Sequence, residues 1–376
     1  MRRVGRIARC ASLLAALLCS RAAAAPLTEF PLPTVGSRPL GIAAGPDGAL
    51  WFCEYSANRI GRLTIDGGLS EYDVPTPASQ PIGIVAGPDG ALWFAEFAAG
   101  QIGRIDLDGA VRQYPLPDRG AAPFFIAVGA DGALWFTEHD GNAIGRLTTD
   151  GGLSEYPVPT AASGPIGITA GHFGELWFAE FYASRIGRVD GAGEVTELVI
   201  PIEESGPRDV AVAADGSVYV SLELVDRIGR FATDGSFSSL ALQPDSHPRH
   251  LVIGPDAGVW FTEFAGDRIG RVGRGGALRE IGGLSARSRP LDVAVGADGR
   301  LWFTQADGNR VGALEVPPCP GDCDASRTVT IAELLRAVRL VLGESVECAA
   351  ADANGDGAVH VDDLIAAVDA GLRGCD

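Results

Sequence analysis

Lysine is absent from this sequence, so arginine supplies all 30 of its basic side chains. Without a side-chain amine the protein cannot form a Schiff base, and it has no residue for the phosphate contact of a Walker-type loop. Acidic residues outnumber basic ones and give a formal net charge of −18. Because such a charge repels phosphate groups and anionic lipids, we expect no nucleic acid partner.

Long apolar segments are also scarce, and the one near the start of the chain has the features of a signal peptide. Arginines precede an apolar run over residues 10–19, and Ala22–Ala24 offers a small-residue cleavage site. We place the cleavage after Ala24, so that residues 1–24 are removed and the protein is secreted or periplasmic. No later stretch is long and apolar enough to cross a bilayer, so we expect no membrane insertion.

Cysteine is sparse in most of the chain and concentrated at its end. Cys319, Cys323, Cys348 and Cys375 lie in the last part of the sequence, which predicts disulfides in an oxidising compartment. Four cysteines allow three pairings, among which we favour Cys319 with Cys375. Cys53 is left over, and we expect it to be a buried small hydrophobic residue.

What the chain has in abundance is one repeated phrase. Residues 45–52 read Gly-Pro-Asp-Gly-Ala-Leu-Trp-Phe, and an Ile-Gly-Arg step follows at 60–62. The tryptophan position recurs every 42 or 41 residues, at Trp51, Trp93, Trp135, Trp177, Tyr219, Trp260 and Trp302. Because this period combines strand-length segments with turn residues, it predicts an all-β, seven-bladed β-propeller over residues 25–318.

Each copy contains four strand-like segments, which in the first copy are Pro39–Ala44, Ala49–Glu54, Arg59–Ile65 and Leu69–Val74. The last copy ends before its fourth segment. A matching segment occurs instead at the front, in residues 27–33, so we expect the N-terminal strand to complete the final blade and close the ring.

Residues that recur in every copy cannot define one site. Glutamate follows the tryptophan by three residues in most copies, and arginine ends the Ile-Gly-Arg step. These side chains could surround a channel, but we favour a repeated ion pair or hydrogen bond that fixes blade geometry.

Positions that break the repeat are better candidates for a site. The residue after the blade-opening proline is apolar in the first four copies, including Phe124, and then becomes Arg208, Arg249 and Leu291. His247 and His250 flank Arg249. If these positions face the central funnel, the arginines and His250 oppose an apolar wall and suit a small ligand with an anionic or carbonyl group. The alternative is a surface rim where substitutions drift freely.

The composition changes after Pro317–Pro318. Two twelve-residue segments place candidate oxygen ligands at alternate positions and a carboxylate at the end, the pattern that Ca²⁺ requires. The first set is Asp322, Asp324, Ser326, Thr328 and Glu333, and the second is Asp352, Asn354, Asp356, Ala358 and Asp363. An apolar-periodic helix is expected after each segment, so residues 319–376 are predicted to form a small α-helical double calcium-loop domain.

This pair of segments resembles a dockerin type I module. The resemblance implies Ca²⁺ binding and a cohesin-like partner; the other interpretation is a calcium-stabilised tail without a partner. Arg327 stands where the pattern has glycine in the first loop.

The phrases Trp-Phe-Thr-Glu and Ile-Gly-Arg, with the Glu-Tyr-x-x-Pro endings, make residues 27–316 similar to the streptogramin B lyase (virginiamycin B lyase) family. The resemblance implies Mg²⁺-assisted opening of a cyclic ester, with a histidine as general base and two carboxylates on the metal. The general base corresponds to Leu291, the carboxylates to Arg289 and to Gln305 or Ala306, and a substrate-positioning histidine to Arg249.

Two hypotheses follow. The first is a secreted binding or scaffold propeller, with a small molecule or a glycan in its funnel, attached through its calcium module. The second is an enzyme with a relocated site around His250, Glu263 and Arg249, which would use Mg²⁺ if the lyase chemistry is retained.

Overall fold

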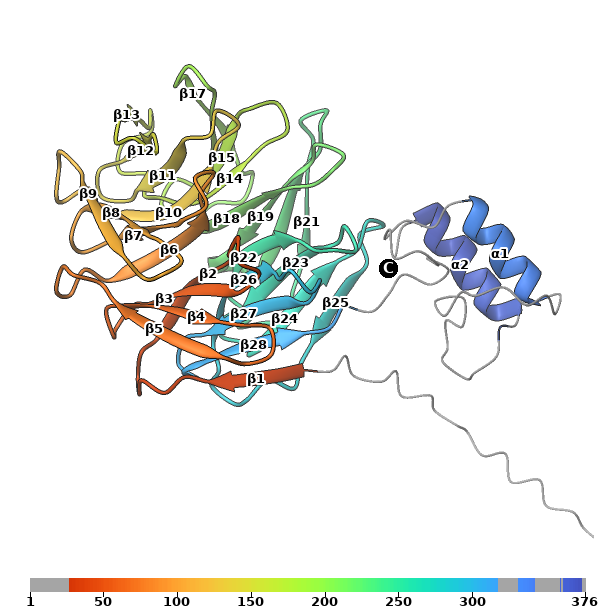
Figure 1. The fold of residues 1–376 in the computed structure, drawn as a ribbon. Helices are drawn as coiled ribbons and strands as arrows, with labels where there is room; N and C mark the ends of the chain where they lie inside the picture. Colours follow the sequence, from red (N-terminus) through yellow and green to blue (C-terminus); the bar gives the residue numbers. More distant parts are fainter. Residues whose placement is uncertain (1–26, 317–330, 342–358, 360, 374–376) are drawn as a thin grey trace, which may run out of the picture.

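A computed structural model describes residues 27–316, 331–341, 359 and 361–373 of the 376-residue chain. These residues form seven four-stranded antiparallel sheets arranged around a central axis, and two α-helices (Figure 1). The fold is therefore the all-β seven-bladed propeller that the tryptophan spacing predicts. In the part of the chain that is described, no helix is both long and apolar enough to span a membrane.

The strands follow one order in every blade, from the innermost strand outward. Blade 1 consists of β2 (Pro39–Ala44), β3 (Leu50–Glu54), β4 (Arg59–Leu63) and β5 (Leu69–Asp73). Blade 2 consists of β6 (Pro81–Ala86), β7 (Leu92–Glu96), β8 (Gln101–Ile105) and β9 (Val111–Pro115). Blade 3 consists of β10 (Pro123–Val128), β11 (Leu134–Glu138), β12 (Ala143–Leu147) and β13 (Leu153–Pro157). Blade 4 consists of β14 (Pro165–Ala170), β15 (Leu176–Glu180), β16 (Arg185–Val189) and β17 (Val195–Val199). Blade 5 consists of β18 (Pro207–Val212), β19 (Val218–Leu222), β20 (Arg227–Phe231) and β21 (Phe237–Ala241), with the 3-10 turn η1 (Glu223–Val225) between β19 and β20. Blade 6 consists of β22 (Pro248–Ile253), β23 (Val259–Glu263), β24 (Arg268–Val272) and β25 (Leu278–Ile281), and blade 7 contains β26 (Pro290–Val295), β27 (Leu301–Gln305) and β28 (Arg310–Leu314).

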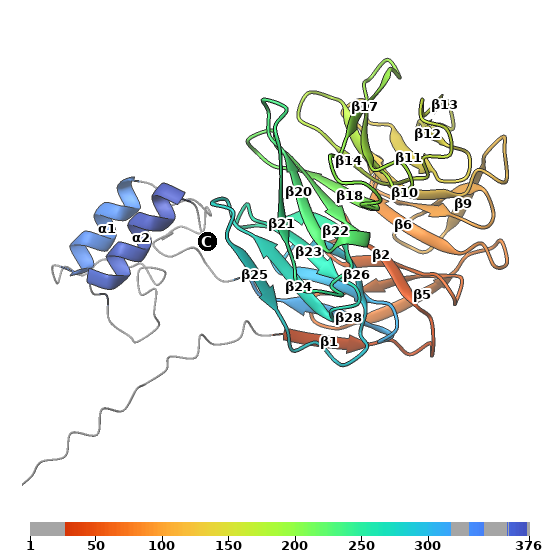
Figure 2. The same ribbon diagram turned by 180° about the vertical axis from the view of Figure 1, so that it is seen from behind.

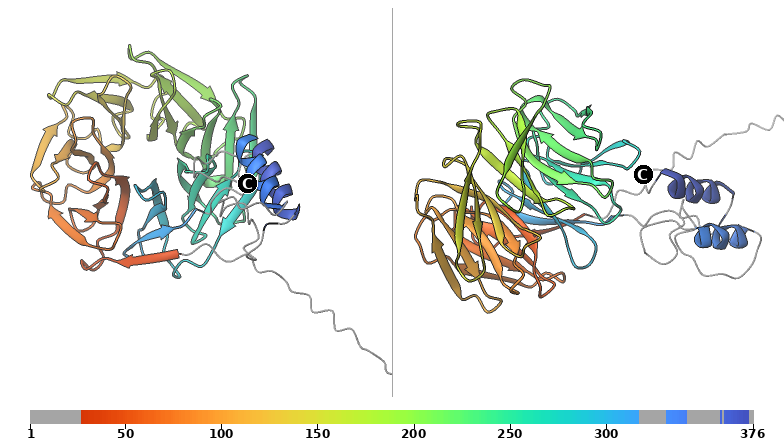
Figure 3. Two further views of the ribbon diagram at one scale, coloured as in Figure 1. Left: turned by 45° about the vertical axis from the view of Figure 1, so that its right-hand side comes forward. Right: turned by 90° about the horizontal axis from the view of Figure 1, so that it is seen from above.

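The N-terminal strand completes blade 7, as the sequence predicts. β1 (Leu27–Pro31) pairs antiparallel with β28, in a register that sets Leu27 opposite Leu314 and Pro31 opposite Arg310 (Figure 2). Phe30 stacks on Trp302, with ring centroids 5.4 Å apart. The views in Figure 3 show the resulting circle of sheets, whose last member is built from both ends of the propeller segment. This pairing covers the free edge that β28 would otherwise expose.

The repeated residues form the contacts that hold each blade together. Trp51 is fully buried, donates its indole N–H to Asp47 at 3.1 Å and stacks on Tyr72. The glycine of the Ile-Gly-Arg step is required by packing, because a Cβ on Gly61 would lie 2.1 Å from the ring of Phe52. Apolar clusters of this kind fill the spaces between neighbouring blades, so each blade is stabilised mainly by the burial of its neighbour's face.

The repeated arginine has a structural role, as we favoured, but its partner is not the repeated glutamate. Arg62 forms an ion pair with Asp47 of the turn at 2.7 Å and lies over the ring of Trp51. Glu54 is buried instead, and burial, together with the nearby Glu71 carboxylate, raises its pKa to about 8. The expected strand-to-strand pair between these two repeated residues is therefore wrong, because the register sets the arginine opposite the tryptophan.

The two helices at the end of the chain, α1 (Ile331–Val341) and α2 (Val361–Arg373), contact each other. Glu333 and Asp363, the final residues of the two predicted calcium loops, lie near the helix starts and are buried. The other eight predicted ligands, the four C-terminal cysteines and the signal peptide lie outside the described residues. Cys53 is a buried free thiol, as expected.

Candidate functional site

A pocket of about 170 Å³ is formed where the innermost strands of the blades converge, and we call it the central pocket. It is lined mainly by the residues that follow the blade-opening prolines. Its lining comprises Arg38, Leu40, Tyr55, Ile82, Phe97, Phe124, Phe125, Arg208, Arg249 and Leu291. Four of the five residues proposed from the sequence as ligand-binding residues thus come together. The fifth, His247, is partly buried outside this lining, where its backbone N–H donates to Asp226 at 2.7 Å.

One side of the central pocket carries positive charge. The guanidinium of Arg249 binds Glu223 at 2.8 Å, and that of Arg208 lies 3.6 Å from the same carboxylate. Burial, and next the neighbouring charge of Arg208, lowers the pKa of Arg249 to about 10, although Glu223 acts in the opposite direction. The Nε of Arg208 is buried and has no hydrogen-bond partner among the described residues. Glu223 therefore does not satisfy both cations.

The rest of the lining of the central pocket is mainly aromatic and aliphatic. Phe124 is edge-on to Phe97 at 5.6 Å, and the guanidinium of Arg208 lies 5.5 Å from the centre of the Phe124 ring. Leu40, Ile82 and Leu291 complete this wall. An apolar wall facing two convergent cations is suited to a ligand that has an apolar body and one anionic or carbonyl group.

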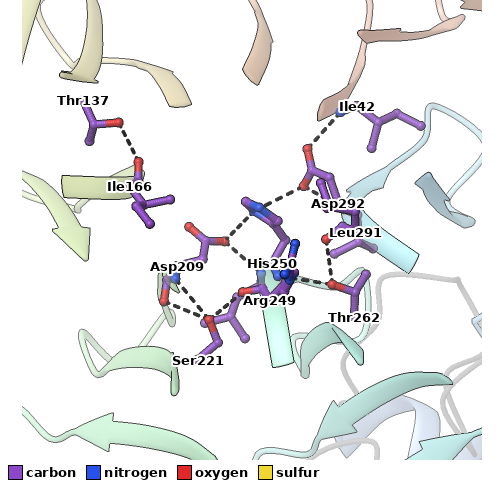
Figure 4. A network of polar contacts seen from close by, with 12 residues as sticks. Ile42, Thr137, Ile166, Asp209, Ser221, Arg249, His250, Thr262, Leu291 and Asp292 are labelled. Carbon is purple, nitrogen blue, oxygen red and sulfur yellow. Dashed lines mark hydrogen bonds and ion pairs between the residues drawn. The ribbon is translucent and has the colours of Figure 1, made fainter. Parts of the chain in front are cut away.

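A polar network connects the blades close to the axis (Figure 4). Nδ1 of His250 lies 3.3 Å from Asp209 of blade 5 and 3.6 Å from Asp292 of blade 7. Asp209 also accepts the backbone N–H of Leu251 at 2.9 Å, and Asp292 that of Ile42 at 2.8 Å. The three side chains therefore couple blade 5 to blade 6, blade 6 to blade 7, and blade 7 to blade 1.

This network is enclosed rather than open to a substrate. His250 is 2% exposed, and the ring of Phe125 lies 4.3 Å from its own ring. Burial raises the pKa of Asp292, although the neighbouring His250 works against this. His250 does not line the central pocket, and its Nε2 has no hydrogen-bond partner among the described residues.

Hydroxyl groups link neighbouring blades only where the second residue after the blade-opening proline is not glycine. Thr262 accepts the backbone N–H of His250 and donates to the carbonyl of Leu291 in the next blade (Figure 4). Thr137, Ser221 and Thr304 make the equivalent pair of bonds in their blades. Where this residue is glycine, the hydroxyl is replaced by Cys53, Ala95 or Ala179. This pairing of residue types was present in the sequence, but we did not detect it.

The residues of the relocated-site hypothesis do not converge on one cavity. Glu263 is buried, binds Arg268 at 2.7 Å and is absent from the lining of the central pocket. Arg249 lines the pocket, and His250 lies outside its lining. The structure thus places the general-base candidate and the carboxylate candidate apart from the surface that a ligand would contact.

The positions that correspond to the lyase metal site do not fit Mg²⁺. Arg289 is a cation that pairs with Asp307 at 3.2 Å, and Leu291 is a buried aliphatic side chain. Gln305 is buried and donates its side-chain amide to Glu29 at 2.9 Å. Because Mg²⁺ requires oxygen ligands, usually carboxylates, this set cannot hold it, and we derive no chemical step through the metal.

Comparison with known proteins identifies strong similarity to one family. The model of the virginiamycin B lyase family matches residues 16–205 and 195–318. A streptogramin B lyase structure is 32% identical, with a TM-score of 0.74, over 78% of this chain and 98% of that one. Virginiamycin B lyase from Staphylococcus aureus is 33% identical, with a TM-score of 0.74, over 78% of this chain and 99% of that one.

A second S. aureus structure is a catalytically inactive histidine-to-alanine variant of virginiamycin B lyase with quinupristin. It is 32% identical, with a TM-score of 0.74, over 78% of this chain and 99% of that chain. More distantly, hydrazine synthase from Kuenenia stuttgartiensis shares the fold at 17% identity and a TM-score of 0.64, over 74% of this chain and 96% of that one.

Proposed function

Because this chain belongs to the virginiamycin B lyase family, we propose that it is an exported propeller that binds a small ligand in its central pocket without opening it. The ligand has an apolar body and at least one carbonyl or anionic group. The observation that carries the proposal is the incompletely paired Arg208, whose Nε is buried without a partner among the described residues, in a cavity that it lines with Arg249 and with aromatic and aliphatic side chains. A buried unpaired donor is costly, and a ligand oxygen would remove that cost.

Binding without turnover is supported by the residues that occupy the catalytic positions of the family. Leu291 cannot accept a proton, and Arg289 cannot bind a cation. Loss of a general base lowers a rate by roughly two to four orders of magnitude, and loss of the metal removes an electrophile as well.

Quinupristin is the first probe, because it is the compound in a similar S. aureus structure. We expect calorimetry to show binding, and mass spectrometry to show the intact compound after incubation with Mg²⁺. Arg208→Gln should weaken binding about ten-fold, the effect of losing one charged hydrogen bond. Arg112→Gln, which changes an exposed arginine on β9, is the matched control and should bind like the wild type.

Two outcomes would contradict this proposal. Absence of quinupristin binding would argue against a ligand of this class. A ring-opened product that disappears in His250→Ala would support the alternative, an active lyase with a relocated site around His250, Glu263 and Arg249.

We further propose that residues 319–376 form a calcium-dependent docking module with a cohesin-like partner. The support is an apolar surface on both helices at matching positions thirty residues apart, where Ile331 and Val361, and Leu335 and Ile365, are more than half exposed. Glu333 and Asp363 would be the final Ca²⁺ ligands. The test is a calcium titration of the full chain, followed by binding to an immobilised cohesin domain with and without chelator; unchanged binding in chelator would contradict the proposal.

A further inference from the structure

Blade 4 departs from the other blades at the turn between its first two strands. In the other six blades this turn supplies an aspartate that forms an ion pair with a blade arginine. In five of them the same aspartate also accepts the indole N–H of the blade tryptophan. Blade 4 has Phe173 at this position, and Glu175 two residues later accepts the indole N–H of Trp177 at 3.2 Å.

This exchange leaves the arginine of blade 4 without its usual partner. The guanidinium of Arg188 forms no ion pair or hydrogen bond with a described residue, although Arg62, Arg104 and the other equivalents all do. Arg188 is exposed and lies over the ring of Trp177, 5.9 Å from its centre. Although burial works against it, the hydrogen bonds from Trp177 and Phe173, together with the nearby charge of Arg188, lower the pKa of the Glu175 carboxyl. Glu175 forms no ion pair with Arg188 among the described residues, because its oxygens accept the N–H groups of Phe173 and Trp177.

The aromatic stack of blade 4 is also incomplete. In blades 1, 2 and 3 a tyrosine of the outermost strand packs on the tryptophan, with centroids 5.2 to 5.6 Å apart. Leu198 occupies this place in blade 4. Trp177 is consequently partly exposed, whereas the five other tryptophans are at most 1% exposed.

These substitutions lie together around a pocket of about 340 Å³ between blades 4 and 5, which we call the blade 4 pocket. Phe173, Glu175, Trp177, Arg188 and Leu198 line it from blade 4, and Val212 and Phe231 from blade 5. Phe173 is 91% exposed. His172 binds the carbonyl of Ala213 at 2.8 Å and so ties the altered turn to the next blade.

We propose that the blade 4 pocket is a second binding site, separate from the central pocket, for small aromatic carboxylates. The guanidinium of Arg188 offers two parallel N–H donors, which match the two oxygens of a carboxylate. The exposed indole and phenyl rings accept a flat apolar body by stacking. The volume of the pocket lies in the range of small-molecule sites.

Trp177 provides a specific readout, because it is the partly exposed tryptophan of a chain whose other five are buried. Quenching of tryptophan fluorescence by acrylamide therefore reports mainly on this residue. Benzoate, the probe, should protect Trp177 from acrylamide with a dissociation constant on the order of millimolar, as for a ligand of this size. Benzamide has the same shape without the charge and should protect at least about ten-fold less well.

Three variants define the site. Arg188→Gln should weaken protection by benzoate about ten-fold. The pair Phe173→Asp with Glu175→Ala introduces the residues of blades 1 to 3, which should re-pair Arg188 and abolish protection while leaving the blade intact. Trp177→Tyr should remove the quenchable signal, and Arg112→Gln should behave like the wild type.

The proposal is overturned if benzoate and benzamide protect Trp177 equally. It is also overturned if protection survives in the Phe173→Asp, Glu175→Ala variant, or if no protection is seen at saturating benzoate. None of these results bears on the central pocket, because Trp177 does not line it.

Discussion

Glu223 balances the charge of the central pocket, because it is the carboxylate that Arg208 and Arg249 share. It is 6% exposed, and both arginines are largely buried beside aromatic rings. The two guanidinium groups repel each other, which is one reason why the pKa of Arg249 is lowered after the larger effect of burial. The stability of this cluster therefore depends on a single anion.

The first prediction concerns this anion. Glu223→Gln should lower the free energy of unfolding by about 3 kcal/mol, because it leaves buried cations without their counter-charge. Thermal and urea unfolding measure the effect. Glu203→Gln, at an exposed position between β17 and β18, is the control and should have no effect. Equal stability of Glu223→Gln and the wild type would show that solvent already screens the two arginines.

At the scale of single residues, the sequence located the central pocket better than it located the polar network. Arg208, Arg249, Phe124 and Leu291 were found because each breaks or continues one repeat position. Asp209, His250 and Asp292 also occupy one repeat position, but their mutual contact depends on how near the axis that position lies. Sequence spacing shows which residues are equivalent, but it does not give their distance from the propeller axis.

At the scale of elements, β1 closes the ring by completing the sheet of blade 7. Its five residues pair with β28, and Glu29 accepts hydrogen bonds from Ser285 and Gln305 of blade 7. Phe30 supplies the aromatic cover of Trp302 that tyrosines supply in blades 1 to 3. The N-terminal segment could be predicted because the last repeat lacks its fourth strand.

The second prediction follows from this pairing. Deletion of residues 27–33 from the mature protein should lower the melting temperature by at least about 5 °C, because the stack on Trp302 and a full strand of ladder bonds are lost. It should also cause aggregation through the exposed edge of β28. Differential scanning calorimetry and light scattering provide the measurements. Removal of residues 1–24 alone, the predicted signal peptide, should change neither result.

The Glu–Arg pair was wrong at this same scale because the sequence shows spacing along a strand but not the partner across a turn. Arg62 pairs with the turn residue Asp47 at 2.7 Å, whereas the strand register sets Glu54 opposite Arg59. Blade 4 departs from this pairing, since its turn has Phe173 in place of the aspartate.

At the scale of the whole molecule, the shifted pKa values of equivalent carboxyl groups in several blades add up in the pH dependence of stability. Burial, and next a neighbouring glutamate, raises the pKa of Glu54 and of Glu138 to about 8 and that of Glu180 to about 7. The turn aspartates behave in the opposite way. Although burial works against it, the hydrogen bonds from Trp51 and Arg62 lower the pKa of Asp47.

The third prediction is the resulting pH profile. Between pH 4.5 and about 8 the folded protein keeps protons on these glutamates that the unfolded chain has released, so stability falls as the pH rises. Below about pH 4 the aspartates become protonated and their contribution is lost. The melting temperature should therefore be highest near pH 5 and lower at pH 8 by on the order of 5 °C.

A substitution tests whether the buried glutamates, rather than the net charge of the protein, cause this pH dependence of stability. Glu54→Gln keeps a neutral side chain of similar shape at one of the three sites, so it should reduce the slope between pH 5 and pH 8. Glu203→Gln removes an exposed charge and should leave the slope unchanged. A melting temperature that rises from pH 5 to pH 8 in the wild type would show that the repeated glutamates are ionised in the folded state.

The whole propeller could be predicted because a single repeat length recurs through it. The C-terminal domain was predicted only from two calcium-loop patterns. Helices are present at the end of both patterns, at α1 and α2, and Glu333 and Asp363 lie near their starts. Calcium binding, docking and export remain predictions.

The pairing of β1 with β28 also determines when, during synthesis of the chain, the ring of blades can close. β1 has no partner strand until almost the entire propeller has been synthesised, so the ring cannot close before β28 (Arg310–Leu314) is available. Earlier blades can assemble one after another in the meantime, each against its predecessor. A chain that lacks its last hairpin would thus remain an open arc of blades, because β1 pairs only with β28.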